Sequence, residues 1–209
     1  MIDHILYATP DLPATVDELN RRFGVRLSPG GRHLTLGTRN YLADLGGRTY
    51  FEVLGPDRDL PDPENGRPLG IDRLTRPRLA TWAARVDDVD KVVREAGERG
   101  FRFDPVVAMS RDRGDGVRLA WRAAVPAGGL TFGGVVPFLV QWESDAYAAE
   151  LSVKGVGLVS LTVSHPEAAT VREHLALLGL ADCVTVGESA EPSLRVTLRT
   201  PAGEVALGR

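Results

Sequence analysis

The feature that most constrains the fold of this chain is an order of one strand, one helix and three strands that occurs three times along the sequence. The first copy opens with an apolar run that includes Ile2, Ile5 and Leu6. A helix is expected at 11–22, because Leu12, Val16 and Leu19 recur at the spacing of one helical face. The strands that complete this copy are expected at 25–28, 41–45 and 49–54.

The same order begins again at Leu79 and once more near Gly157. A single unit of this kind covers only one face of its small mixed sheet with its helix. Two units side by side make one sheet that curls into a bowl, and alternate residues of its strands line the concave face. We therefore expect an α+β fold in which tandem βαβββ modules at 1–56 and 79–142 pair into a curled mixed sheet.

Two linkers set the expected domain boundaries. The linker at 57–78 is rich in proline and in charged residues, which is typical of a loop. The second linker, at 143–154, begins with polar residues. The predicted domains are a bowl at 1–145 and a third βαβββ-like half-module at 155–209.

Composition excludes several classes of partner. The chain has 209 residues and a net charge of −3, and its basic and acidic residues are intermingled. Nucleic-acid binding requires a clustered basic face, so no nucleic-acid partner is expected. No apolar stretch approaches the roughly 20 residues of a membrane span, and no secretory signal opens the chain, so we expect a cytoplasmic protein without a membrane partner.

Several segments carry a resemblance to a known family: IDHILYATPDL, GGRHLTLGTRNYLADLG, TYFEVLGPD, VRLAWR and VPFLVQW. Over about 2–142 the chain resembles the vicinal oxygen chelate superfamily, which includes glyoxalase I, extradiol dioxygenases and bleomycin-resistance proteins. The resemblance is sharpest to the bacterial glyoxalase-like domain proteins. It implies that the first and last strands of each module point one side chain each into the bowl, where the four side chains can hold a divalent metal ion.

The residues at those four positions leave two interpretations open. When the second copy is aligned with the first, Thr81 corresponds to His4 and Gln141 corresponds to Glu52. The resemblance implies a metal site made of His4, Glu52 and Gln141, which suits Zn, Mn, Fe, Ni or Co. Threonine and glutamine are weak ligands, however, and open catalytic metal sites usually have three good ones. The alternative is a pair of His4 and Glu52 that bond to one another, either as a general base or as a purely structural pair.

Further candidates for ligand binding lie in the glycine-rich segment after the first helix and in the second module. Arg32, His33, Arg39 and Asn40 are predicted to bind a carboxylate or enolate oxygen of a ligand. The alternative for this segment is a solvated surface turn. Trp121 either lines the cavity or packs in the core.

Three classes of function remain. The first is an enzyme of lyase or isomerase type that transforms a small oxygenated metabolite with His4 and Glu52, with or without a metal ion. The second is a metal-free small-molecule binding or resistance protein. The third is a catalytically inactive scaffold. In each case the third half-module is a candidate for pairing two chains into a homodimer.

Overall fold

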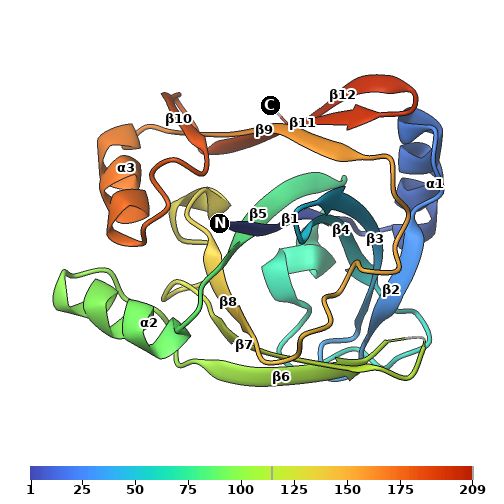
Figure 1. Ribbon diagram of the computed structural model, residues 1–209, viewed down its shortest axis with the longest axis horizontal. Helices are drawn as coiled ribbons and strands as arrows, with labels where there is room; N and C mark the ends of the chain where they lie inside the picture. The colour runs from blue at the N-terminus through green and yellow to red at the C-terminus, as the bar shows by residue number, and fades with distance from the viewer. Residues whose placement is uncertain (114, 209) are drawn as a thin grey trace.

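The computed structural model of the chain describes residues 1–113 and 115–208, so Arg209 of the predicted third unit lies outside it. Three successive units each contain a strand, a helix and three strands, as the sequence predicts (Figure 1). The first unit consists of β1 (Ile2–Ala8), α1 (Leu12–Phe23), β2 (Ser28–His33), β3 (Thr38–Gly46) and β4 (Thr49–Pro56). The second consists of β5 (Arg78–Arg85), α2 (Val89–Glu98), β6 (Val107–Asp112), β7 (Arg118–Ala124) and β8 (Phe138–Trp142). The third consists of β9 (Gly157–His165), α3 (Ala168–Leu177), β10 (Thr185–Glu188), β11 (Ser193–Thr200) and β12 (Gly203–Gly208).

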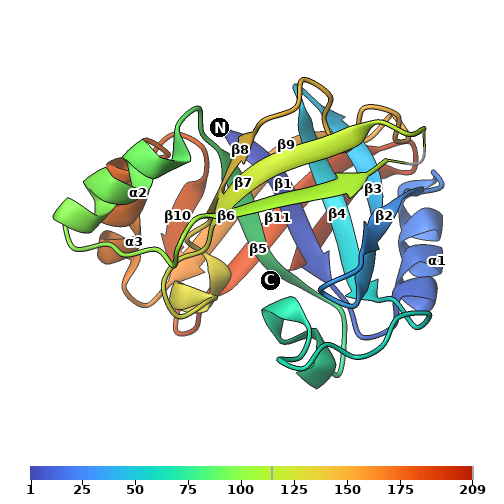
Figure 2. The same ribbon diagram turned by 90° about the horizontal axis from the view of Figure 1, so that it is seen from below.

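The first two units share one eight-stranded sheet in the order β2-β3-β4-β1-β5-β8-β7-β6. In each of these two units the first strand pairs in parallel with the last, and β1 pairs with β5 in antiparallel fashion at the centre. The sheet curls until its edge strands β2 and β6 approach one another (Figures 1 and 2). The predicted bowl is therefore confirmed, and the curvature nearly closes it into a barrel.

Capping signals explain the helix of the first unit. Asp11 caps the start of α1 by accepting a hydrogen bond from the backbone N–H of Ala14. Gly24 ends the helix with φ of +69°, a left-handed conformation that glycine adopts without strain. The apolar face of this helix, which includes Leu19 and Phe23, is buried against the sheet.

The second strand of the first unit does not lie where the sequence predicts it. The expected strand at 25–28 ends where β2 begins, and β2 runs through the glycine-rich segment, in which the sequence predicts no strand. The pairing of β2 with β3 shifts register between Pro29 and Arg32. Bulges of this kind accommodate glycines inside a strand, and the strand periodicity of the sequence does not reveal them.

The third unit keeps the element order of the other two but not their strand order. Its four-stranded sheet has the order β10-β9-β11-β12, so the first strand lies between the second and third and does not pair with the last. This sheet covers the outer face of the eight-stranded sheet, between α1 on one side and α2 and α3 on the other (Figure 1). The predicted third βαβββ-like half-module is therefore confirmed in its element order, and its strand order differs from that of the other two units.

One hydrophobic cluster joins the two sheets. Phe51 and Trp82, on the outer face of the large sheet, share it with Leu161, Val196 and Leu198 of the third unit. All five side chains are at most 3% exposed. The predicted boundary near residue 150 thus separates two sheets that share a single core.

Linker 57–78 is fastened to the bowl by Arg67, whose side chain is only 6% exposed. Its Nε donates to the carbonyl of Gly37 at 2.8 Å, and its two Nη atoms contact Asp72 at 2.6 Å and Asp62 at 2.5 Å. The short helix η1 (Pro68–Arg73) follows directly. Arg67 therefore sets where this helix sits at the mouth of the bowl.

We expect Arg67→Ala to lower the free energy of unfolding by about 2 kcal/mol, because the Gly37 carbonyl and the carboxylates of Asp62 and Asp72 lose their donor. The loss stays below that of a fully buried pair because Asp62 is largely solvated. Urea denaturation measures the change. Arg58→Ala in the same linker is the control and should change stability by less than about 0.5 kcal/mol, because Arg58 is exposed. Equal losses in the two variants would contradict this role of Arg67.

The third unit also holds a histidine without a partner. Nδ1 of His174 in α3 is buried and has no hydrogen-bond partner among the described residues. Its ring packs on Phe101 and Phe132, with centroids 4.4 Å and 5.1 Å away. Burial lowers the pKa of His174 below its usual 6.5.

The lowered pKa makes stability fall in mild acid. Below pH 6.5 the unfolded chain binds a proton at this position more readily than the folded chain, so protonation favours unfolding. We expect the melting temperature to drop between pH 7.5 and pH 5.5, and the drop to be smaller in His174→Leu. A His174→Leu variant with the same pH dependence as the wild type would contradict the assignment.

Among the described residues, no helix has both the length and the apolar character needed to cross a membrane.

Candidate functional site

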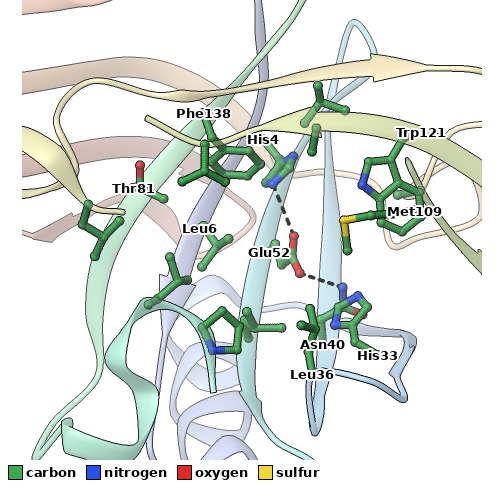
Figure 3. Close-up of a pocket in the computed structure, with 18 of the residues that line it drawn as sticks. His4, Leu6, His33, Leu36, Asn40, Glu52, Thr81, Met109, Trp121 and Phe138 are labelled. Atoms are coloured by element: carbon green, nitrogen blue, oxygen red, sulfur yellow. Dashed lines mark hydrogen bonds and ion pairs between the residues drawn. The ribbon is translucent and has the colours of Figure 1, made fainter. Parts of the chain in front are cut away.

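His4 reaches the cavity from the central strand β1. Its side chain is 7% exposed, and its ring stacks on Tyr50, with centroids 4.6 Å apart and an interplanar angle of 21°. The edge of Phe138 lies against it at 5.3 Å. The imidazole Nδ1 donates to the Asp3 carboxylate at 2.8 Å. This bond leaves Nε2 free to face Glu52 (Figure 3).

Glu52 enters the cavity from β4, next to β1. Its Oε2 lies 3.5 Å from Nε2 of His4, and its Oε1 accepts a hydrogen bond of 2.7 Å from Asn40 (Figure 3). The Asn40 amide oxygen in turn accepts from the backbone N–H of Gly31 at 2.8 Å. The result is a continuous polar chain of Asp3, His4, Glu52 and Asn40 inside a mostly apolar pocket.

Asp3 is a site residue that the sequence reasoning missed. Alternation along a strand would place it on the face opposite to His4. The pairing of β1 with β5 shifts register between Ile2 and His4, however, and the Asp3 side chain lies against the His4 ring. Asp3 is fully buried and also accepts a hydrogen bond from the indole of Trp142 at 2.9 Å. The adjacency of an acid and a histidine was the only signal in the sequence.

A glycine makes the Asn40 contact possible. A Cβ atom added to Gly30 would lie 2.2 Å from the amide oxygen of Asn40 and 2.9 Å from Leu42. Any side chain there would displace Asn40 from Glu52. The glycine pair at 30–31, which the sequence placed in a loop, therefore has a packing role within β2.

The cavity has a volume of about 220 Å³. Its walls are mainly apolar and aromatic, and they come from both modules and from both linkers. The lining includes Leu6, Leu36, Leu54, Leu69, Met109, Ala123, Leu130, Val136, Val140 and Ala148. A pocket of this kind accepts a small molecule with an apolar body and few polar groups.

The structure brings four of the other predicted site residues into the wall of this cavity. His33, Asn40, Thr81 and Trp121 line it together with the pair of His4 and Glu52. Thr81 has its hydroxyl engaged, since Oγ1 donates to the carbonyl of Gly134 at 3.0 Å. Trp142, which is not among the predicted site residues, also lines the cavity.

Gln141 lies outside the residues that line the cavity. Its Oε1 accepts a hydrogen bond of 2.9 Å from the backbone N–H of Val89, the first residue of α2. Val140 lines the cavity from the same strand. The alignment of Glu52 with Gln141 is thus displaced by one residue, which moves a side chain to the other face of a strand.

Arg32 and Arg39 also lie outside the cavity lining. Nε of Arg32 contacts the buried Asp57 carboxylate at 2.5 Å, and this bond raises the pKa of the guanidinium. Arg39 lines a separate surface groove together with Asp57 and Tyr41. The predicted set of four ligand-binding residues is therefore divided, and only His33 and Asn40 belong to the cavity.

The donor set does not fit a divalent metal ion. Among residues 1–113 and 115–208, no group of three or more His, Cys, Asp or Glu side chains could hold one. His4 and Glu52 are two strong ligands, whereas Val140 and the engaged Thr81 complete the set poorly. A carboxylate behind the imidazole, as in Asp3, is found both with metal-bound histidines and with general bases. The number of ligands, and not Asp3, argues against the metal.

Two further groups shape the electrostatics of the cavity. Burial lowers the pKa of His33; the charge of Glu52 opposes this shift, and those of Arg111 and His4 add to it. Nδ1 of His33 lies 3.0 Å from Oγ1 of Thr38. Burial also raises the pKa of Tyr50, which keeps this phenol neutral where it stacks on His4.

Comparisons with known proteins agree with the fold. A family model described as a glyoxalase-like domain matches residues 2–179. A solved structure titled as a hypothetical protein from Staphylococcus aureus is 15% identical, with a TM-score of 0.64, and the match covers 99% of this chain and 84% of that chain. No curated protein matches the sequence.

Two solved structures of methylmalonyl-CoA epimerase are also similar. The enzyme from Mycobacterium tuberculosis is 22% identical, with a TM-score of 0.45, over 67% of this chain and 86% of that chain. A structure of the enzyme in complex with methylmalonyl-CoA and NH4+ is 22% identical, with a TM-score of 0.48, over 70% of this chain and 96% of that chain.

Proposed function

This chain belongs to the glyoxalase-like domain family, and from that premise we propose that it binds a small oxygenated molecule in the cavity and moves a proton on it with His4 and Glu52. The observation that carries the proposal is that Nε2 of His4 and Oε2 of Glu52 face one another, 3.5 Å apart, inside apolar walls. Asp3 accepts a hydrogen bond from the other ring nitrogen of His4, and Asn40 donates one to the other oxygen of Glu52. Pairs of this kind are typical of general acid–base sites.

The roles of the residues follow from their hydrogen bonds. Asp3 accepts from Nδ1 of His4, so that Nε2 is the nitrogen that takes up a proton from the substrate. Asn40 holds one oxygen of Glu52 and leaves the other to return a proton or to receive one. The apolar surroundings strengthen these interactions, because the effective dielectric constant is lower than in water. The supported reaction class is proton transfer at a carbon beside a carbonyl group, as in an isomerisation.

Proton exchange tests this proposal directly. The protein is incubated in D₂O with a panel of small 2-oxo and 3-oxo compounds, and NMR records deuterium at the carbon next to the carbonyl. We expect the wild type to accelerate exchange for a subset of the panel and His4→Gln to lose the acceleration. Exchange at the same rate in both proteins would contradict the proposal.

A metal-free binding protein is the second candidate, and the incomplete ligand set favours it. Such a protein would hold a compound of the panel with an affinity that His4→Gln leaves unchanged, and it would accelerate no exchange. The metal alternative has a separate readout. Elemental analysis of protein purified without chelator or affinity metal would support it if a stoichiometric ion is found and is lost in His4→Ala.

A further inference from the structure

Arg111 is a buried cation in the wall of the cavity. It lies on the edge strand β6, is only 9% exposed, and belongs to the lining of the pocket. Its Nη1 donates to the carbonyl of Gly30 on β2 at 3.1 Å, so the side chain spans the seam where the barrel nearly closes. No pattern in the sequence marks this residue as part of the site.

Among the described residues, no carboxylate forms an ion pair with Arg111, although Glu52 lies in the same cavity. The ion pairs in this part of the chain involve other groups, and the polar partner found for Arg111 is a neutral carbonyl. A buried guanidinium without a counter-ion is costly unless something else supplies negative charge. Among the described residues, the guanidinium makes one hydrogen bond, through Nη1, and the side chain lines the cavity.

The backbone is adapted to hold the guanidinium in this place. A Cβ atom added to Gly31 would lie 2.5 Å from Nη1 of Arg111 and 3.1 Å from its Cζ. Gly31 therefore provides the space that the side chain occupies, while its N–H holds Asn40. Gly30 thus leaves room for Asn40, which bonds to Glu52, and Gly31 leaves room for the guanidinium of Arg111.

We propose that Arg111 binds the carboxylate of the substrate, so that the cavity takes a small organic acid with an apolar body. This inference rests on the proposed function and names its substrate class. One guanidinium balances one negative charge, and its planar fork matches the two oxygens of a carboxylate. A doubly charged phosphate group would leave excess negative charge near Glu52. The apolar and aromatic walls around the pair account for the rest of the ligand.

A matched pair of probes tests the substrate class. Benzoate and benzamide have the same shape and differ in charge, and their affinities for the full chain are measured by calorimetry or by ligand-observed NMR. We expect the wild type to prefer benzoate by about 10- to 100-fold, as one charge-assisted hydrogen-bonded pair implies. Arg111→Met should reduce the preference to about onefold, and Arg111→Lys should keep part of it.

The outcomes separate this inference from the proposed function. Equal binding of the two probes by the wild type, no saturable binding of benzoate at millimolar concentration, or an unchanged preference in Arg111→Met would each overturn the role of Arg111. A benzoate preference that depends on Arg111, together with no His4-dependent proton exchange, would support Arg111 and contradict catalysis. If Arg111→Met fails to fold, Gly31→Ala is the second variant. It displaces the guanidinium without removing it and should lower the benzoate preference.

Discussion

A chain that ends at Gly155 is expected to lose the folded bowl. This truncation removes β9 to β12 and α3, and with them the layer that covers Trp82 and Phe51. The buried apolar residues of the removed part include Leu161, Val163, Leu175, Leu180, Leu194, Val196, Leu198 and Leu207. The truncation exposes Trp82 and Phe51 of the bowl to water. Burial of each large apolar side chain contributes about 1.5–3 kcal/mol, so losing this cover removes a large share of the roughly 5–15 kcal/mol that stabilises a whole domain.

The loss is measured by near-UV circular dichroism and by the dispersion of amide signals in NMR.

A point variant gives the same information without a new terminus. Leu198→Ala is expected to cost about 2–5 kcal/mol, because Leu198 is fully buried between the sheets. Val159→Ala on β9 is the control and should cost less than about 1 kcal/mol, because Val159 is 44% exposed. A truncated chain with dispersed signals and cooperative unfolding would show that the bowl folds without the third unit, in line with the predicted domain boundary.

The elements that sequence analysis located well are those with local signals. Asp11 and Gly24 mark the ends of α1, and both cap it in the structure. The repeated order of strand, helix and three strands identified the paired modules, and these bring His4 and Glu52 together because the first and last strands of a module are neighbours in the sheet. The fold and the central pair were therefore predictable.

The remaining features depend on contacts between distant segments. Gln141 and Trp142 lie on β8, a strand with apolar residues on both faces, so its hydrophobicity does not tell which residue faces the cavity. Asp3 depends on a register shift, and Arg111 on the approach of β2 and β6 across the barrel seam. The sequence does not determine the strand order of the third unit either. The same element order allows the first strand to pair with the last strand, as in the other two units, or to lie between the second and the third.

The second large effect is expected on the rate of proton exchange when His4 is replaced. In the proton-exchange assay, His4→Gln should lower the rate by about 10²- to 10⁴-fold, the usual contribution of a positioned general base. Glutamine retains hydrogen-bonding capacity and approximate size, so the affinity for the exchanging compound should change much less than the rate. A fall in affinity with an unchanged rate at saturation would identify His4 as a binding residue only.

Variants of the residues behind the pair separate positioning from catalysis. Asp3→Asn removes the charge that fixes the Nδ1–H tautomer of His4, and it should slow exchange while leaving the affinity for the probe nearly constant. Glu52→Gln should slow exchange as well, whereas Leu36→Met, a change in the apolar wall, should alter the rate less than about fivefold. If Asp3→Asn lowers only the melting temperature, Asp3 is structural and the tautomer argument fails. If all three polar variants slow exchange and the wall variant does not, the rate depends on the chain of hydrogen bonds and not on the shape of the cavity.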